Sequence, residues 1–281
     1  MPDRLVAALR CPICAEELRL QPGALRCPRR HTFDIAKQGY VNLLGRAPGD
    51  NADDAEMVRA REEFLCAGHY APLADDLAEA ASCHGDGVVL DAGAGTGYYL
   101  AGVLDRMPEA VGVAMDLSKY ALRRAARAHP RAGAVLWDVW RPLPVRDGSI
   151  FVLLNVFAPR NGAEFRRVLR PDGALVVVTP NPDHLAEAVS ALDLLSVDER
   201  KDERLDRTLS PHFRLEHTGA RTVDLQVSRA DLLRVAAMGP AAHHRDPDEL
   251  RRRAEAVPDP LRVTLSCAIS VYRPLDHQPS R

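Results

Sequence analysis

From residue 87 onward, short apolar runs alternate with segments in which apolar residues recur every three or four positions. The apolar runs have the length of buried strands and cover 87–92, 110–115, 134–138, 149–155 and 174–179. The segments with helical periodicity cover 97–107, 118–128 and 162–169. This succession of strand and helix predicts an α/β fold with a parallel sheet covered by helices on both faces.

The segments on either side of this alternation follow other patterns. Residues 1–35 alternate short apolar pieces with turns. Two amphipathic helices are expected at about 54–67 and 72–82. Near the C-terminus, 221–227 and 261–272 have the pattern of long strands. We expect these two strands to form an antiparallel pair that closes the sheet.

These patterns divide the chain into three expected parts. Residues 1–46 form an N-terminal module, 47–84 a linker with helices that border the sheet, and 85–281 the α/β domain. A chain of 281 residues with 46% hydrophobic content is long enough for one such domain and a small appendage. No apolar run approaches the roughly 18 residues of a membrane span, and the N-terminus lacks a signal-peptide pattern. We therefore expect a cytoplasmic protein that does not contact a membrane.

The charge of the chain is unevenly distributed. The formal net charge is -2, but Lys and Arg outnumber Asp and Glu by four within the first 46 residues. A basic module of this kind can bind RNA phosphates, and it can equally be an ordinary solvated surface. The candidate RNA-binding residues in it are Arg26, Arg29, Arg30 and Lys37.

The N-terminal module also contains the spacing of a zinc site. Cys11 and Cys14 form one close pair, twelve residues follow, and Cys27 and His31 form a second pair. With a hairpin reversal at 21–23, the two pairs can surround one tetrahedral Zn²⁺ with no open position, which indicates a structural site. A DNA-reading finger needs a helix leading into its first His, and the prolines and glycine of this segment interrupt such a helix. The pattern therefore favours a zinc-binding β-hairpin, not a DNA-binding finger.

A glycine loop follows the first strand of the α/β domain. Asp91 precedes Gly93, Gly95 and Gly97, but Tyr98 stands where a dinucleotide fingerprint needs its last glycine. A carboxylate before the first glycine would repel a pyrophosphate and suits a cationic ligand such as S-adenosylmethionine. The acids that end the next two strands, Asp116 and Asp138, are placed to accept from the ribose hydroxyls and the adenine amino group. Asp138 also fits a plain turn residue.

Several segments in a fixed order resemble one family. They are the zinc quartet, 33–44, 64–73, 91–99, Phe157-Ala-Pro159 and 179–185. Over roughly residues 11–190 the chain is similar to the class I (Rossmann-like) methyltransferases that modify N1 of a guanine in large-subunit rRNA. The resemblance implies S-adenosylmethionine as methyl donor and, as substrate, a guanine in the loop of hairpin 35 of 23S rRNA. It also suggests a homodimer whose two zinc modules flank an RNA cleft.

The resemblance places further residues at the active site. Thr96 and Tyr98 of the glycine loop, together with Tyr70 and His184, are expected to contact the cofactor. The catalytic group is expected to be Asn155, Phe157, Pro159 and His184, with Asn155 and the Phe157–Pro159 backbone orienting the guanine edge and Phe157 stacking on its ring. The family has two branches that act on neighbouring guanines. The composition and the Asn155-Val-Phe157 sequence favour the nucleotide 748 branch, which includes a tylosin-resistance enzyme, over the nucleotide 745 branch.

Three alternatives stay open at the level of the sequence. A small-molecule methyltransferase with a structural zinc site would show an apolar substrate pocket without a basic rim. A non-enzymatic zinc protein that binds RNA would carry a decayed cofactor loop, yet Asp91, the three loop glycines and Asp116 are all present. A dehydrogenase shares the combination of a glycine loop with an acid about 20 residues later.

Overall fold

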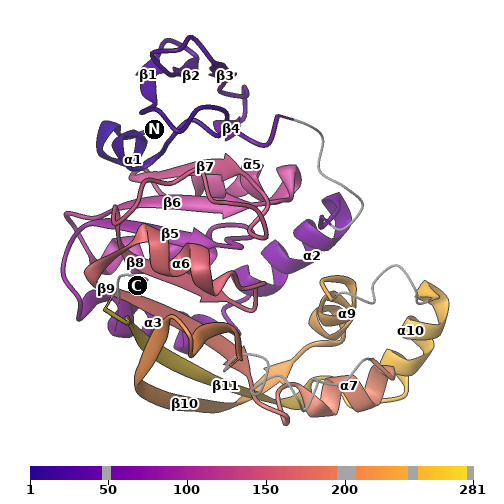
Figure 1. Cartoon of the computed structure of the whole chain (residues 1–281). Coiled ribbons are helices and arrows are strands. Elements are labelled where there is room, and N and C mark those ends of the chain that lie inside the picture. The colour runs from indigo at the N-terminus through magenta and orange to yellow at the C-terminus, as the bar shows by residue number, and fades with distance from the viewer. Residues whose placement is uncertain (46–51, 195–206, 240–245, 277–281) are drawn as a thin grey trace.

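The computed structural model describes residues 1–45, 52–194, 207–239 and 246–276, so the expected boundary at 46/47 lies outside the described residues. An eight-stranded sheet forms its centre, in the order β10-β11-β9-β8-β5-β6-β7-β4 (Figure 1). The strands are β4 (Tyr40–Asn42), β5 (Val88–Ala92), β6 (Val111–Asp116), β7 (Ala132–Leu136), β8 (Ile150–Val156), β9 (Leu169–Pro180), β10 (Phe213–Val227) and β11 (Leu261–Pro274).

The parallel part of this sheet confirms the predicted alternation of strand and helix. The strands from β4 to β9 pair in parallel, because each strand returns through a helix or loop on a face of the sheet. β6 and β7 lie on one side of β5, and β8 lies on the other. The chain therefore reverses its direction of winding at the carboxyl end of β5, which is where open α/β sheets bind their ligands.

The predicted antiparallel pair at the other edge is also present. β11 pairs antiparallel with both β9 and β10. β10 begins at Phe213, eight residues before the predicted start at 221. Residues 214–218 are all exposed, so this half of an edge strand lacks the alternation of buried and exposed positions that marks a strand in the sequence.

Helices cover both faces of the sheet (Figure 1). Asp54 caps the first of the predicted pair of helices, since its side chain accepts from the backbone N–H groups of Glu56 and Met57. The larger helices of the molecule are α2 (Ala55–Cys66), α3 (Ala71–Ser82), α4 (Tyr98–Arg106), α5 (Lys119–Ala128), α6 (Gly162–Val168), α7 (Ala186–Leu192), α9 (Arg229–Ala237) and α10 (Pro247–Glu255).

The N-terminal module contains a separate three-stranded sheet of β1 (Arg19–Gln21), β2 (Ala24–Arg26) and β3 (Thr32–Asp34). Gly23, with φ of 76°, makes the tight reversal between β1 and β2. Two parts of residues 1–46 pack on the central sheet instead. The helix α1 (Asp3–Ala8) lies beside β7, where Leu5 approaches Gly133, and β4 pairs in parallel with β7. Neither element was predicted, since both are too short for a periodic pattern.

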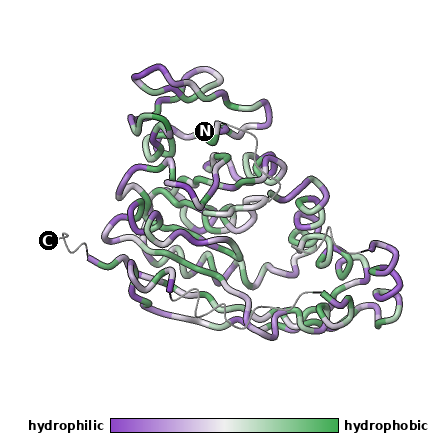
Figure 2. The backbone as a smooth tube through the Cα atoms, turned by 45° about the vertical axis from the view of Figure 1, so that its right-hand side comes forward, coloured by the Kyte–Doolittle hydropathy of each residue, from purple (hydrophilic) through white to green (hydrophobic). Residues whose placement is uncertain are grey.

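Hydrophobic positions concentrate in the central sheet, whereas the outer end of the N-terminal module is largely hydrophilic (Figure 2). Within the described residues, no helix is both long and apolar enough to cross a bilayer. The outer end of the module therefore presents a mainly polar surface, with Ile13 and Leu20 as exposed apolar exceptions, and the buried interior belongs mainly to the α/β domain.

Candidate functional site

The four predicted metal ligands converge at one point of the N-terminal module. Their ligand atoms all lie within 4.8 Å of one another. The Sγ atoms of Cys14 and Cys27 are 3.7 Å apart, and His31 Nδ1 lies 3.5 Å from Cys11 Sγ and 3.3 Å from Cys27 Sγ. Zn–S bonds of about 2.3 Å and a Zn–N bond of about 2.0 Å in a tetrahedron require separations of roughly 3.8 Å and 3.5 Å. The cluster therefore fits a structural Zn²⁺.

Two tight turns, each with a residue of positive φ, bring the ligands together. In the first, Ala15 N–H donates to the Cys11 carbonyl, and Ala15 has a positive φ of 61°. In the second, Arg30 N–H donates to the Cys27 carbonyl, and Arg30 has φ of 70°. Non-glycine residues adopt this conformation at a cost, so the two turns need a stabilising contribution such as a bound metal.

The candidate RNA-binding residues lie on the same module. Arg29, Arg30 and Lys37 are exposed and Arg26 is half-buried. Arg29 is also 3.7 Å from Glu16, a contact between two exposed side chains. These residues present positive charge to solvent around the zinc cluster.

A cavity of about 680 Å³ opens at the carboxyl ends of β5, β6, β7 and β8. The predicted cofactor residues that line it come from strand ends, from the loops that follow strands and from the starts of two helices; they are Tyr70, Asp91, Gly93, Gly95, Thr96, Tyr98, Asp116, Asp138 and His184. Gly97 does not line it. Its φ is 81°, and a Cβ there would lie 3.0 Å from the Ala125 backbone, so this glycine serves close packing of α4 on α5.

Asp91 is the most unusual group in the cavity. Its side chain is 1% exposed, and neither carboxylate oxygen has a hydrogen-bond partner among the described residues. Burial and then the nearby charge of Asp116 raise the pKa of Asp91 to about 8. A buried carboxylate without a partner is costly, and a cationic ligand in the cavity would remove that cost.

Asp116 is held in a fixed orientation. One of its carboxylate oxygens accepts from Gly95 N–H and the other from Ser118 N–H, each at 2.8 Å. Burial raises the pKa of Asp116, and these two hydrogen bonds oppose the rise. Each oxygen retains a lone pair, so the carboxylate can still accept from a ligand's hydroxyl groups.

The loop after β8 forms the opposite wall. Phe157 has φ of 52°, is 39% exposed, and lines the cavity together with Ala158 and Pro159. A Cβ on Gly93 would lie 2.4 Å from the Ala158 Cβ, so only glycine allows the two loops to approach this closely. The glycine loop and the predicted substrate loop are therefore in direct contact.

A family model described as "RlmA, N-terminal" matches residues 9–46, and one described as "Methyltransferase domain" matches residues 89–173. The 23S rRNA (guanine(748)-N(1))-methyltransferase of Streptomyces fradiae is 50% identical over 98% of this chain and 100% of its own length. A protein of Micromonospora griseorubida, provisionally named a 23S rRNA (guanine-N(1)-)-methyltransferase, is 52% identical over 98% of this chain and 99% of its own. The chain belongs to the 23S rRNA (guanine-N1) methyltransferases.

The fold of this methyltransferase also occurs in solved structures. A complex between the Haloferax volcanii Trm112 methyltransferase activator and a methyltransferase contains a chain that matches with a TM-score of 0.51. The match has 14% identity and covers 79% of this chain and 99% of that one. The predicted class I fold, S-adenosylmethionine as cofactor and the zinc module are thereby confirmed.

Asn155 lies elsewhere than expected in the methyltransferase. Its side chain is fully buried and does not line the cavity. Its Nδ2 donates to the Ala92 carbonyl at 3.0 Å and to the Pro159 carbonyl at 2.9 Å. Both donor hydrogens are thus used within the protein, so Asn155 braces the two loops and does not itself reach a guanine edge.

His184 and Tyr70 form a hydrogen-bonded pair. His184 Nε2 is 3.0 Å from the Tyr70 hydroxyl, and His184 Nδ1 faces Ser266 N–H at 3.3 Å. Because Nδ1 accepts, Nε2 carries the proton and donates to Tyr70. Burial raises the pKa of Tyr70, so its hydroxyl keeps its proton and can donate it to another group.

Some cavity residues were not predicted. Tyr99 and the exposed Trp140 line the cavity, and α7 and α9 add an apolar wall that includes Val189 and Val235. The wall comes from two short helices far apart in the sequence, which no local pattern connects. Trp140 had one visible signal, since it is a large aromatic residue two positions after Asp138 in a proline-rich segment that follows a predicted strand.

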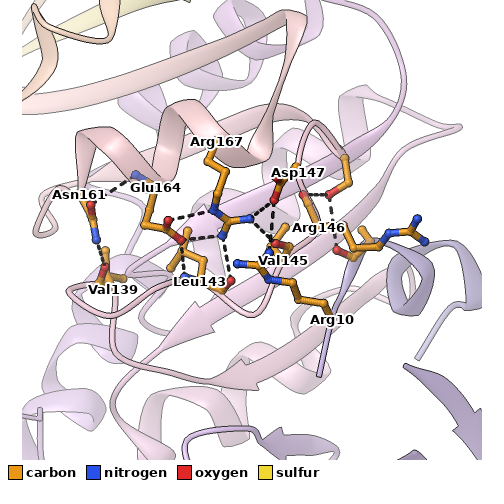
Figure 3. A network of polar contacts seen from close by, with 11 residues as sticks. Arg10, Val139, Leu143, Val145, Arg146, Asp147, Asn161, Glu164 and Arg167 are labelled. Atoms are coloured by element: carbon orange, nitrogen blue, oxygen red, sulfur yellow. Dashed lines mark hydrogen bonds and ion pairs between the residues drawn. The ribbon is translucent and has the colours of Figure 1, made fainter. Parts of the chain in front are cut away.

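A network of hydrogen bonds and ion pairs connects the N-terminal module to the loop between β7 and β8, which borders the cavity (Figure 3). Arg167 of α6 binds both carboxylate oxygens of Glu164 at 2.9 and 2.6 Å and donates to Asp147. Arg10, next to the zinc ligand Cys11, donates to the same Asp147 at 3.3 Å. Burial opposes ionisation of Glu164, but the Arg167 hydrogen bonds prevail and lower its pKa. The loop between β7 and β8 is therefore fixed from both sides.

Proposed function

We propose that this protein transfers a methyl group from S-adenosylmethionine to N1 of guanine 748 in the hairpin 35 loop of 23S rRNA. The observation that carries the proposal is the 50% identity to the Streptomyces fradiae enzyme along the full length, zinc module included. A role in resistance to tylosin-like macrolides follows from that branch.

The cavity residues supply a binding site for the methyl donor. Asp91 pairs with the α-ammonium group, which gives its unpartnered carboxylate a counter-charge. Asp116 accepts from the ribose hydroxyls, Asp138 faces the adenine, and the open side of Gly95 lets the ligand approach the backbone. S-adenosylmethionine, when bound, supplies the electrophilic methyl group.

The guanine occupies the part of the cavity nearest Phe157. Phe157 stacks on the base, and the backbone of Ala158 and Pro159 orients its edge, with Asn155 holding that backbone in place. Catalysis is then mainly a matter of positioning N1 within about 3 Å of the methyl carbon.

Guanine N1 must lose a proton during the transfer. The Tyr70 hydroxyl accepts from His184 and is left to donate, so it can stabilise the negative charge that moves toward guanine O6. His184 acts in this scheme through Tyr70. The proton itself leaves to water, because the Nδ1 atom of His184 is already occupied by Ser266 N–H.

The N-terminal module holds the RNA stem. Arg26, Arg29, Arg30 and Lys37 contact phosphates, while the hairpin loop reaches the cavity. A homodimer would place a second zinc module across the RNA.

The test is to incubate unmodified 23S rRNA with purified protein and labelled S-adenosylmethionine and to map the N1-methyl by the stop it causes in reverse transcription. A single stop at guanine 748 supports the proposal, and a stop at guanine 745 assigns the protein to the other branch. The apolar wall from α7 and α9 favours one second candidate, a small-molecule methyltransferase. Donor binding without any stop in 23S rRNA would favour that candidate and reject ours.

A further inference from the structure

Trp140 stands out among the aromatic residues of the described chain. Its side chain is 67% exposed, whereas the other tryptophan of the protein, Trp137, is buried. The exposed large aromatic side chains in the described segments are Trp140 and Phe157, and both border the cofactor cavity. Phe157 has ring contacts with Tyr70, Tyr99 and His184. The Trp140 ring has no such contact within the described residues.

The backbone under Trp140 is held firmly. Asp138 Oδ1 accepts from Trp140 N–H at 3.0 Å, and the Asp138 carbonyl accepts from Arg141 N–H at 3.0 Å. Asn161 Nδ2 donates to the Val139 carbonyl at 3.1 Å (Figure 3). The turn is therefore rigid, and the exposure of its indole ring cannot be explained by a loose loop. A fixed, exposed aromatic face beside a ligand cavity is suited to stacking.

We propose that Trp140 stacks on the nucleobase adjacent to the target guanine. The inference rests on the proposed function. A guanine that enters the cavity leaves its neighbour without a stacking partner, and the indole ring at the rim replaces that partner. Every base has a π-face, so this contact needs no particular neighbouring base, and it lowers the cost of extruding the guanine.

The experiment uses a hairpin RNA that contains the target guanine, together with Trp140→Ala and Trp140→Phe. We expect Trp140→Ala to lower kcat/KM by roughly 10- to 100-fold, mainly through an increase in KM. This factor corresponds to the free energy that stacking of one base on an aromatic side chain contributes to binding. Trp140→Phe keeps a ring and should retain most of the activity. S-adenosylmethionine affinity, measured by calorimetry, should stay unchanged in both. Leu215→Ala, which removes a 54% exposed side chain of β10 outside the cavity lining, serves as the matched control.

A second RNA, abasic at the nucleotide on one side of the target guanine, makes the test specific. On the abasic RNA that removes the correct neighbour, the wild-type rate should fall to that of Trp140→Ala, and the substitution should have no further effect. Equal activity of Trp140→Ala and wild type on the intact RNA would overturn the inference. So would an unchanged effect of the substitution on both abasic RNAs, or a loss of donor affinity large enough to explain the change in rate. If the wild type methylates no hairpin RNA, the proposed function fails and the inference fails with it.

Discussion

Among the described residues the buried Asp91 carboxylate has no hydrogen-bond partner, and this leads to predictions about both stability and ligand binding. Its pKa is about 8 in the folded protein and 3.8 in the unfolded chain. Between pH 3.8 and about 8, Asp91 is protonated in the folded protein but ionised in the unfolded chain. The free energy of unfolding therefore falls as pH rises through this range. The effect is about 1.4 kcal/mol per pH unit, which amounts to about 4 kcal/mol at pH 7. Asp91→Asn removes it.

The measurement is urea unfolding of the ligand-free protein at pH 6, 7 and 8. The stability of Asp91→Asn relative to wild type should increase by about 1.4 kcal/mol from pH 6 to 7 and by a smaller amount, about 1 kcal/mol, from pH 7 to 8, because the pKa of Asp91 is about 8. The uncharged amide is also buried without a partner, at a cost of about 1–3 kcal/mol, so the slope and not the absolute difference decides the test. Asp86→Asn makes the same charge change at an exposed position just before β5 and should show no such slope.

The same carboxylate must lose its proton to bind an ammonium group. Between pH 6 and 7.5 the affinity of the wild type for S-adenosylmethionine should rise about tenfold per pH unit, with proton release visible by calorimetry in buffers of different ionisation enthalpy. Asp91→Asn should bind roughly 10- to 100-fold more weakly at pH 7.5, without this pH dependence. A wild-type affinity that is independent of pH, combined with normal binding by Asp91→Asn, would refute the ion pair.

Three further changes separate the parts of the molecule. Cys14→Ser removes one zinc ligand, so zinc content and RNA affinity should fall at least about tenfold, while the affinity for S-adenosylmethionine stays within about twofold. Equal losses of RNA affinity and S-adenosylmethionine affinity would show that the two units are not separable. Reversing the charge of Arg29 and Arg30 should lower the slope of log affinity for RNA against log salt by about 1.5 to 2, whereas an unchanged slope would place both outside the phosphate contacts. Arg167→Met leaves the partly buried Glu164, whose side chain is 17% exposed, without its guanidinium partner and should cost about 1–3 kcal/mol in urea unfolding, whereas unchanged stability would show that the Figure 3 network is not stabilising.

The positions of Asp91 and Asp116 could be predicted because each follows a strong apolar run. Neighbouring parallel strands end at the same edge of a sheet, so two acids at two strand ends must lie close to one another. The zinc ligands were predictable for a similar reason, since close pairs on either side of a hairpin leave few other arrangements. In both cases the spacing along the chain restricts the geometry in space.

The role of Asn155 could not be predicted from the sequence in this way. An Asn at a strand end can contact a ligand or the protein backbone, and the sequence does not distinguish the two. Its role depends on the carbonyls of Ala92 and Pro159, which reach it only when the glycine loop packs on Ala158. β4 and the first half of β10 are further examples, because one is three residues long and the other is exposed along most of its length.

The network in Figure 3 relates the zinc module to the cavity rim. Leu9 forms an antiparallel bridge with Val145, and Arg146 N–H donates to the Ala8 carbonyl at 2.8 Å, two to three residues before the first zinc ligand. The same loop carries Trp140 nearer to β7. Between Trp140 and Arg146, Arg167 donates hydrogen bonds to the carbonyls of Leu143 and Val145 and so fixes the loop. A displacement of the chain before the zinc cluster must therefore shift this loop or break these backbone hydrogen bonds, which is costly. If the zinc module holds an RNA stem, as we propose, this coupling would fix the separation between that stem and a base bound at the cavity rim.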